Sequence, residues 1–228
     1  MDKIGEQTLK IMKKADWYNN WLFLLIKPYL GQKILEVGAG LGNFTQQLSS
    51  AGMVTAIDID KTYLNRLGKV HKGMSSGYGN IETGEYFFEN KSFDSAVCLN
   101  VIEHIEDDEK ALKNINKLLE KKGKLIVFSP AHKWAYGTLD KYLGHVRRYT
   151  KEELIKKFEN SGFKVVRVKY LNWLGLLGWY VNGRLLKKKI IPENQLNIFD
   201  KVSRPFLLLE TLFEPPFGLS ILIVGEKI

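Results

Sequence analysis

Apolar runs typical of buried strands alternate along the chain with segments of helical periodicity. The runs lie at residues 33–37, 53–57, 93–99, 124–129, 163–170 and 219–224, and the helical segments at 42–50, 61–69, 107–121 and 150–161. Thr150 and Glu153 have the spacing of a capping box at the start of the last helical segment. This alternation predicts a parallel sheet with helices on both faces.

The segment 71–82 departs from this alternation. A third strand is expected between the helix at 61–69 and the run at 93–99, but the sequence there, HKGMSSGYGNIE, is rich in glycine and serine. Both residue types are common in turns and loops. The sequence therefore predicts a mobile loop, with a third strand that is short or displaced.

Parallel sheets bind ligands beyond the carboxyl ends of their strands. Gly38, Gly40 and Gly42 follow the first predicted strand and precede a helix. Glycine allows the backbone to approach a ligand closely. The dinucleotide fingerprint G-x-G-x-x-G would require a glycine at position 43, where this chain has Asn43. The loop is therefore not the standard dinucleotide loop.

Two acidic residues flank the glycine loop. Glu36 lies within the first predicted strand, and Asp58 follows the second, eighteen residues after Gly40. A carboxylate at this place can accept hydrogen bonds from both hydroxyls of a ribose. Two negative groups repel a pyrophosphate and attract a cation. The combination favours S-adenosylmethionine, which carries a ribose, a sulfonium and an ammonium group.

Four stretches resemble motifs of class I S-adenosylmethionine-dependent methyltransferases, in their broad small-molecule group. They are LEVGAGLGNF, AIDID, KSFDSAVCLNVIEHIEDD and GKLIVFSP, within residues 30–130. The resemblance implies a Rossmann-like α/β fold: a seven-stranded, mostly parallel sheet with an antiparallel last strand at 219–224. It also implies a single domain over residues 1–228, with a helical entrance at 1–30 and acceptor-side insertions at 130–149 and 171–218.

The resemblance assigns cofactor-binding roles by position. The glycine loop would line the methionine end, Asp58 would bind the ribose and Ile59 would lie against the adenine. Asn80 stands where an acid usually meets the adenine amino group, and its amide oxygen can accept instead. Tyr18 would close over the cofactor or, alternatively, pack in a helix core. The full expected set is Tyr18, Glu36, Gly38, Ala39, Gly40, Asp58, Ile59, Asn80, Ile81, Asn100 and Val101.

A narrower subgroup of this family, often associated with glycosyltransferases, resembles the chain in three further stretches. They are WYNNWLFLLIKPYLG, PAHKWAYGTLDKYLGHVRRYT and PPFGLSILIVGEK. This subgroup has no settled substrate. The expected acceptor is a small molecule, a lipid or a glycan, with in-line transfer to an oxygen. No oligomeric state is predicted.

Methyl transfer to a hydroxyl requires a base near the reacting atoms. His132 and His145 lie in the insertion that commonly faces the acceptor, so either is a candidate, and each also suits an ordered loop. His104, in IEHI, is expected to play a structural role. The same stretch resembles a loop of quinone-pathway O-methyltransferases that binds a divalent metal through Glu, Glu and His. Since Asn100 replaces the first acid, no metal is expected.

Three residues that follow His145 are candidates for substrate binding. Arg147 and Arg148, beside Tyr149, can bind an anionic group through paired hydrogen bonds. The alternative is that the two arginines pair with the acidic stretch EDDE at 106–109.

The net charge of +9 favours acidic partners such as anionic lipid, phosphorylated substrates or nucleic acid. Residues 172–191 join an apolar half to a basic end with Arg184, Lys187, Lys188 and Lys189. This pattern fits an interfacial helix on an anionic membrane, a cap over an apolar substrate, or a packed lid helix. The single cysteine and the polar start favour a cytoplasmic protein, peripheral at the membrane if that contact occurs.

Other functions explain less of the sequence. Asn43 disfavours a nicotinamide dehydrogenase. An RNA methyltransferase fits the net charge, but LNVIEHI lacks the Asn-Pro-Pro-aromatic motif of base-amine methylation. No cysteine is placed to attack a pyrimidine either, since Cys98 lies within a predicted strand. Nucleic acid is therefore the less favoured acceptor. A noncatalytic module that binds S-adenosylmethionine and regulates a partner is the remaining alternative.

Overall fold

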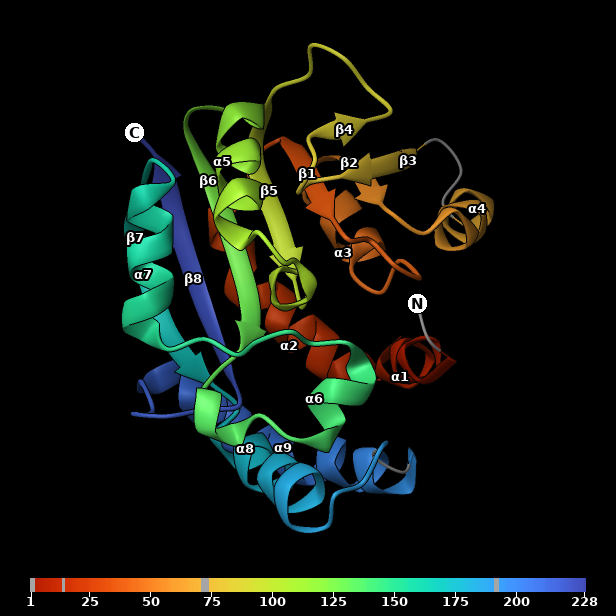
Figure 1. The fold of residues 1–228 in the computed structure, drawn as a ribbon, viewed down its shortest axis with the longest axis vertical. Coiled ribbons are helices and arrows are strands. Elements are labelled where there is room, and N and C mark those ends of the chain that lie inside the picture. Colours follow the sequence, from red (N-terminus) through yellow and green to blue (C-terminus); the bar gives the residue numbers. More distant parts are fainter. Residues whose placement is uncertain (1–2, 14, 71–73, 191–192) are drawn as a thin grey trace.

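The computed structural model describes residues 3–13, 15–70, 74–190 and 193–228. Their strands form an eight-stranded sheet in the order β4-β3-β2-β1-β5-β6-β8-β7 (Figure 1). The strands are β1 (Lys33–Val37), β2 (Met53–Asp58), β3 (Ser75–Asn80), β4 (Glu85–Tyr86), β5 (Phe93–Leu99), β6 (Leu119–Pro130), β7 (Phe163–Leu171) and β8 (Ser220–Lys227). Strands β1, β2, β3, β5 and β6 pair in parallel, whereas β8 is antiparallel to both of its neighbours. The expected fold class is confirmed, and the short β4 adds an edge strand antiparallel to β3.

The third strand lies in the segment for which a loop was predicted, so that prediction was wrong for Ser75–Asn80. Packing explains the unusual composition. A Cβ added at Gly77 would lie 2.4 Å from the Phe87 ring, and one at Gly79 would lie 2.7 Å from Ile57. Glycine is needed here for close approach within a strand, rather than for a turn. The rest of the predicted loop, 71–73, falls outside the described residues.

Helices cover both faces of the sheet. Helices α5 and α7 pack on one face, and α2, α3, α4 and α9 contribute apolar side chains to the other. The helices are α1 (Lys3–Lys13), α2 (Asp16–Ile26), α3 (Thr45–Ser49), α4 (Lys61–Val70), α5 (Asp108–Leu118), α6 (Thr138–Leu143), α7 (Lys151–Asn160), α8 (Trp173–Tyr180) and α9 (Glu193–Leu212). Short helical turns are η1 (Lys27–Tyr29), η2 (Ile102–His104), η3 (Lys133–Ala135) and η4 (Val181–Leu185).

Two local signals for helix ends had different outcomes. The Thr150 hydroxyl accepts a hydrogen bond from the Glu153 N–H at 3.2 Å, which confirms it as the cap of α7. The helix predicted at 107–121 is followed by Gly123, a residue type that commonly marks a helix end, but α5 stops at Leu118 and β6 already begins at Leu119. Gly123 instead lies inside the long strand, where a Cβ would come within 2.8 Å of the Glu120 carbonyl.

The segments inserted outside the sheet gather near the carboxyl ends of its parallel strands. In Figure 1, α1, α6, α8 and α9 lie at this end of the molecule, beyond β1, β5 and β6. None of the helices in the described part of the chain is both long and apolar enough to cross a bilayer. The inserted helices thus cover the edge of the sheet where ligands of such folds bind.

Candidate active site

A cavity of about 1060 Å³ lies at the carboxyl ends of the parallel strands. This volume is at the upper end for a small-molecule site, which leaves room for a cofactor and an acceptor together. Every residue expected to bind the cofactor lines it: Tyr18, Glu36, Gly38, Ala39, Gly40, Asp58, Ile59, Asn80, Ile81, Asn100 and Val101. Apart from Tyr18 on α2, they lie at or just after the ends of four strands, β1, β2, β3 and β5, so the fold brings together what the sequence spreads over more than eighty residues.

The glycine loop adopts a backbone that requires glycine. Gly38 has φ +70°, and a Cβ added there would lie 2.4 Å from the side chain of Val101. Gly40 has φ +53°, and its N–H donates to Asp58 Oδ2 at 2.8 Å. A side chain at Gly38 would therefore push apart the loops that follow β1 and β5.

The two acids beside this loop are buried at the cavity wall. Asp58 accepts from the Gly40 and Asp60 N–H groups, one on each oxygen, and each oxygen keeps a lone pair for a ribose hydroxyl. Glu36 accepts from the Thr45 hydroxyl at 2.7 Å. Burial raises the pKa of both carboxyl groups, that of Glu36 to about 8. A cationic ligand would offset this cost of burial, so the pair fits the expected sulfonium cofactor.

The predicted adenine end lies between the loops after β2 and β3. Ile59 lines the cavity with 66% of its surface exposed, and Ile81 is buried on the opposite loop. The Asn80 Oδ1 atom accepts from the N–H groups of Glu82 and Thr83 at 3.0 and 3.2 Å. The oxygen expected to meet the adenine amino group therefore also stabilises the turn after β3.

The N-terminal helices cover the glycine loop. Leu9 and Met12 of α1 line the cavity, and the Leu9 carbonyl accepts from the Asn43 side-chain amide at 3.1 Å. Tyr18 of α2 also lines it, with its ring 5.5 Å from that of Trp21. Asn43, which breaks the dinucleotide fingerprint, thus ties the loop to the helical entrance.

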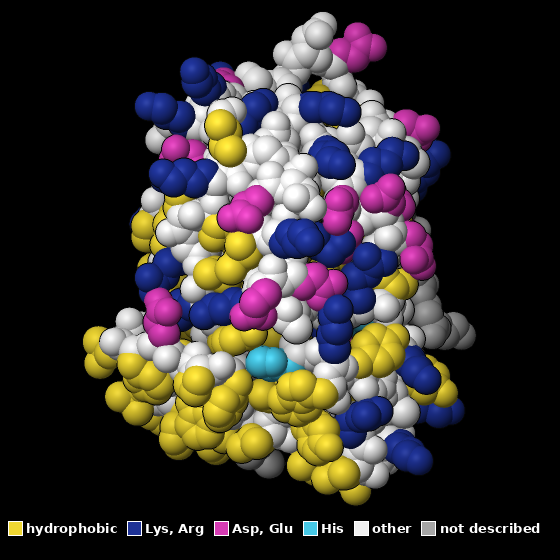
Figure 2. Space-filling model, turned by 60° about the vertical axis from the view of Figure 1, so that its left-hand side comes forward, with side chains coloured by type: hydrophobic (Ala, Val, Ile, Leu, Met, Phe, Trp, Pro, Cys, Tyr) yellow, Lys and Arg dark blue, Asp and Glu magenta, His cyan; other side chains and the backbone are white. Residues whose placement is uncertain are grey.

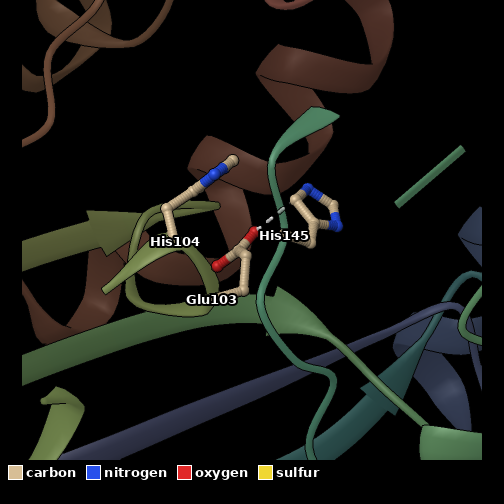
Figure 3. Close-up of side chains that lie close together, drawn as sticks. All are labelled: Glu103, His104 and His145. Carbon is tan, nitrogen blue, oxygen red and sulfur yellow. Dashed lines mark ion pairs between the residues drawn. The ribbon is translucent and has the colours of Figure 1, made fainter. Parts of the chain in front are cut away.

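Three side chains gather on the side of the cavity away from the glycine loop: Glu103, His104 and His145 (Figure 3). His104 and His145 line the cavity, whereas Glu103 is fully buried and does not line it. The first two belong to η2, directly after β5, and His145 follows α6. One ligand atom from each side chain lies within 4.8 Å of the other two. In Figure 3 the Glu103 carboxylate points toward the His145 ring, and their nearest atoms, Oε1 and Nε2, are 4.0 Å apart. Such a cluster can hold a divalent cation or move a proton.

A buried carboxylate, Asp140, holds His145 in place. Its Oδ1 atom accepts from His145 Nδ1 at 2.9 Å and from Arg148 Nε at 2.7 Å. Its Oδ2 accepts from the Trp179 indole N–H at 3.1 Å. Burial alone would raise the pKa of Asp140, but the His145 hydrogen bond and the Arg148 charge outweigh it and lower that pKa. Asp140 is therefore held as a carboxylate, and it fixes which nitrogen of His145 faces the cavity.

The other predicted catalytic and substrate residues are placed differently. His145 and Arg148 line the cavity, whereas His132, Arg147 and Tyr149 do not. The His132 ring stacks on Tyr170 with centroids 4.6 Å apart, and its Nε2 accepts from the Gly218 N–H at 3.4 Å.

The remaining two of these residues face the start of α5. Arg147 pairs with Asp108 at 3.0 Å, and the Tyr149 hydroxyl donates to the same carboxylate at 2.8 Å. Tyr149 is fully buried. The alternative expectation was that the arginines pair with the acidic stretch at 106–109. It is confirmed for Arg147, whereas Arg148 pairs with Asp140 instead.

The sequence did not predict a role for Asp140 or Trp179 at the site. It also did not predict that Glu103 would lie next to His145. These residues meet only because the chain from 130 to 149 folds back over η2 and under α8. The stretch DKYLGHVRRY carried a partial signal: an acid, a histidine and two arginines within ten residues. Nothing in that spacing indicated which of them would pair.

Comparison with known proteins agrees with this geometry. Residues 35–127 match the methyltransferase domain family. An uncharacterised protein of Methanocaldococcus jannaschii is 27% identical over 199 residues, which cover 84% of each chain. The ubiquinone biosynthesis O-methyltransferase of Pseudomonas aeruginosa is 28% identical over 102 residues, or 42% of this chain and 44% of that enzyme.

A second characterised relative is phosphoethanolamine N-methyltransferase 2 of Caenorhabditis elegans. It is 32% identical over 127 residues, which are 54% of this chain and 27% of that enzyme. The chain therefore aligns with less than half of the length of either characterised enzyme. These comparisons do not support the expected association with glycosyltransferases.

Solved structures share the whole fold. A methyltransferase of Thermotoga maritima superposes with a TM-score of 0.65 and 20% identity over 100% of both chains. A second, of Bacillus halodurans, covers 90% of this chain and 96% of its own with a TM-score of 0.61 and 17% identity. The chain therefore has the fold of the class I S-adenosylmethionine-dependent methyltransferases, and its residues 35–127 form a domain of the methyltransferase family.

Proposed function

We propose that this enzyme methylates an oxygen atom of a small amphiphilic molecule, of lipid or glycolipid type. The observation that carries the proposal is the extent of the cavity. One cavity is lined both by the residues expected to bind the cofactor and by His104, His145 and Arg148. The acceptor is proposed to occupy the part that the latter three residues line.

S-adenosylmethionine, when bound, supplies a methyl group on a positively charged sulfur, open to in-line attack by an acceptor oxygen. The protein's contribution is then to align the two reactants and exclude water. Glu36 and Asp58 are proposed to hold the cofactor by charge and by hydrogen bonds to its ribose. The helical entrance, with Leu9 and Tyr18, closes that part of the cavity against solvent.

The acceptor hydroxyl is proposed to lose its proton through His145 rather than His132. His145 lines the cavity, and Asp140 binds its Nδ1, so that Nε2 is the nitrogen left to act. His132 is stacked on Tyr170 and does not line the cavity. A fixed ring and a free nitrogen are what a proton-transfer group needs.

Arg148 is proposed to recognise a second oxygen of the acceptor. Its Nε donates to Asp140 and its Nη1 to the Ala131 carbonyl at 2.9 Å, but Nη2 is buried and has no partner within the part of the chain that the structure describes. The guanidinium also lies over the Trp179 ring at 5.1 Å. A buried donor without a partner is costly, and an acceptor oxygen at the cavity wall would satisfy it.

The outer surface of the same region favours an amphiphilic acceptor. Exposed apolar side chains of α8, η4, α9 and the following loop gather at the lower end of the molecule in Figure 2. We call them the apolar cap surface, and each is between 42% and 83% exposed: Leu177, Val181, Leu185, Leu186, Leu208, Leu209, Leu212, Phe213 and Phe217. Patches of this kind mark contact with a membrane or a partner.

Charge around this surface favours an anionic membrane. Its described acids are neutralised: Asp200 pairs with Arg204, Glu214 pairs with Arg167, and Glu210 is buried. In contrast, Arg184, Lys187 and Lys201 are exposed and form no ion pair with any described residue. Exposed apolar and basic side chains together provide the two signals that membrane adsorption requires.

The two faces of α8 connect this surface with the cavity. Gly175 and Trp179 line the cavity, whereas Leu177 of α8, and Val181 at the start of η4, belong to the apolar cap surface. An acceptor held in a membrane would thus be one helix away from the site. This arrangement supports a membrane-derived acceptor over a freely dissolved one.

The proposal is tested by transfer of a labelled methyl group from S-adenosylmethionine to separated fractions of lipid, glycolipid, soluble metabolite and RNA. Label in the lipid or glycolipid fraction, stable to conditions that cleave methyl esters and absent from amines, is the expected result. Label confined to RNA or to water-soluble metabolites contradicts the proposed acceptor. The variant Asp58→Ala serves as the control for transfer that depends on the site.

A further inference from the structure

We propose that Glu103, His104 and His145 bind a divalent transition-metal cation at the acceptor end of the cavity. The three side chains meet from two separate segments, η2 and the loop after α6. One ligand atom from each lies within 4.8 Å of the others. Two imidazoles and one carboxylate form a common set of ligands for Zn²⁺, Fe²⁺ or Mn²⁺ sites that keep open positions for a substrate.

Both histidines are held in the form that binds metal. His104 Nδ1 lies 3.0 Å from the Gly144 carbonyl oxygen, and His145 Nδ1 lies 2.9 Å from Asp140 Oδ1. Because each partner only accepts, each Nδ1 carries the hydrogen. Nε2 of each neutral ring therefore keeps its lone pair. Metal-binding histidines usually have their other ring nitrogen bonded to a carbonyl or carboxylate in this way.

Glu103 supplies independent evidence for a cation. It is fully buried, and its Oε2 accepts from the Ser129 hydroxyl at 3.0 Å. Its Oε1 is buried and has no hydrogen-bond partner among the described residues, and it is the atom nearest to His145. Buried carboxylate oxygens without a donor are strongly unfavourable. A cation between Glu103 and the two histidines would remove that penalty.

The surroundings are built to keep these ligands in place. Asp140 orients His145 and is itself bound by Arg148 and Trp179, so the outer contacts of His145 do not depend on solvent. Ligands at 2.0–2.2 Å from one tetrahedral ion lie roughly 3.3 Å apart. The 4.0 Å between His145 Nε2 and Glu103 Oε1 is thus within reach of a small side-chain adjustment.

This site was not expected from the sequence, because Asn100 replaces the acid that a metal-binding loop would need. His145 supplies the third ligand from outside that loop. The purpose of the cation rests on the proposed function: it would bind the acceptor oxygen and lower the pKa of its hydroxyl. With the ion bound, His145 Nε2 would serve as a ligand instead of a base, and the proton of the acceptor hydroxyl would pass to water.

The test is direct metal binding by the full chain, measured without an acceptor. Protein freed of metal with a chelator is titrated with Co²⁺, followed by its visible absorption, and with Zn²⁺ in a calorimeter. We expect one ion per chain. His145→Gln and Glu103→Gln should each bind it at least about tenfold more weakly. His132→Gln removes a histidine outside the cluster and should bind it as tightly as the original protein.

Folding of the variants is checked by their affinity for S-adenosylmethionine, which uses other residues. Because Glu103 is fully buried, the half-buried His104→Gln provides a second ligand variant if Glu103→Gln does not fold. The metal site is overturned if all variants bind the ion with equal affinity. It is also overturned if the original protein binds it no more tightly than the His145→Gln protein does. A bound ion together with methyl transfer confined to RNA would leave the metal site standing and contradict only the proposed acceptor.

Discussion

Asp140 and His145 are joined by a hydrogen bond of 2.9 Å that is buried from solvent at the end of the cavity. The same Asp140 oxygen binds Arg148 Nε at 2.7 Å. One carboxylate therefore orients the imidazole and neutralises a buried guanidinium. The acceptor end of the site consequently depends on a residue that does not itself line the cavity.

Replacing Asp140 should destabilise the protein as well as impair transfer. In Asp140→Asn the Arg148 charge remains buried without a counter-ion, and removal of one partner of a buried pair costs about 3–5 kcal/mol. Denaturant unfolding measures this change. The control is Glu120→Gln, which breaks the exposed pair between Lys33 and Glu120 and should change the free energy of unfolding far less than Asp140→Asn does. An equally small loss of unfolding free energy in both variants would contradict the proposal that Asp140 neutralises the buried Arg148.

Asp58→Ala should weaken binding of S-adenosylmethionine by about ten- to a hundredfold. The variant removes hydrogen bonds to a charged acceptor, each contributing about 1.5–3 kcal/mol, and it frees the Gly40 N–H. Calorimetric titration gives the dissociation constant. Glu85→Ala, on the exposed edge strand, is the matched loss of an acid and should leave the affinity unchanged. Unchanged affinity in Asp58→Ala would remove the ribose assignment.

The cofactor side of the site was predictable because its information is local. Glu36, the glycine loop and Asp58 each lie directly at the end of a strand, and the carboxyl ends of parallel strands meet at one edge of a sheet. The positions of most strands along the chain were predictable from apolar runs, which are also a local feature of the sequence. The third strand did not, because close packing against Phe87 and Ile57 requires glycines that resemble a loop.

The acceptor side was not predictable to the same degree. His145 and Glu103 are neighbours only through the path of the insertion that follows β6, and no periodicity fixes that path. The sequence offered His132 and His145 as equals, and only their packing, on Tyr170 or on Asp140, separates them. For Arg147, the sequence left open substrate binding and pairing with the acids at 106–109, because only the path of the insertion brings Arg147 to Asp108.

The affinity for S-adenosylmethionine should rise with pH through the pKa of Glu36. Burial raises that pKa to about 8 in the cofactor-free protein. The carboxyl group is therefore mostly protonated at neutral pH, and its charged form, which attracts a cation, increases as the pH approaches and passes about 8. Binding should then release a proton below this pH and become independent of pH above it.

Calorimetry between about pH 6 and 9, in buffers of different ionisation enthalpy, reports both effects of Glu36. Glu36→Gln is the control, because its neutral side chain keeps the shape of the site. Its affinity should be weaker at high pH and less dependent on pH than that of the original protein. If the affinity depends on pH to the same extent in the original protein and in Glu36→Gln, the proton released on binding comes from another group, such as the cofactor's own ammonium.

The apolar cap surface should bind vesicles of anionic lipid. Leu212, the most exposed of its side chains at 83%, and Leu185, at 63%, are substituted together with serine. Each leucine contributes about 1.5–3 kcal/mol when fully buried in an apolar phase, so the double variant should sediment with the vesicles at least tenfold less. Met53→Ser, which removes a 70% exposed apolar residue at the start of β2, should bind as the original protein does.

Lipid charge separates the membrane from other occupants of the apolar cap surface. Because the exposed Arg184 and Lys187 flank Leu185 and Leu186 in the chain, binding should be stronger to phosphatidylglycerol than to phosphatidylcholine and should weaken with added salt. A dimer in solution that the double serine variant dissociates, with no vesicle binding by the original protein, would show instead that a second copy covers this surface. In that case the acceptor would have to reach the cavity from solution, and the argument for a membrane-derived acceptor would lose its support.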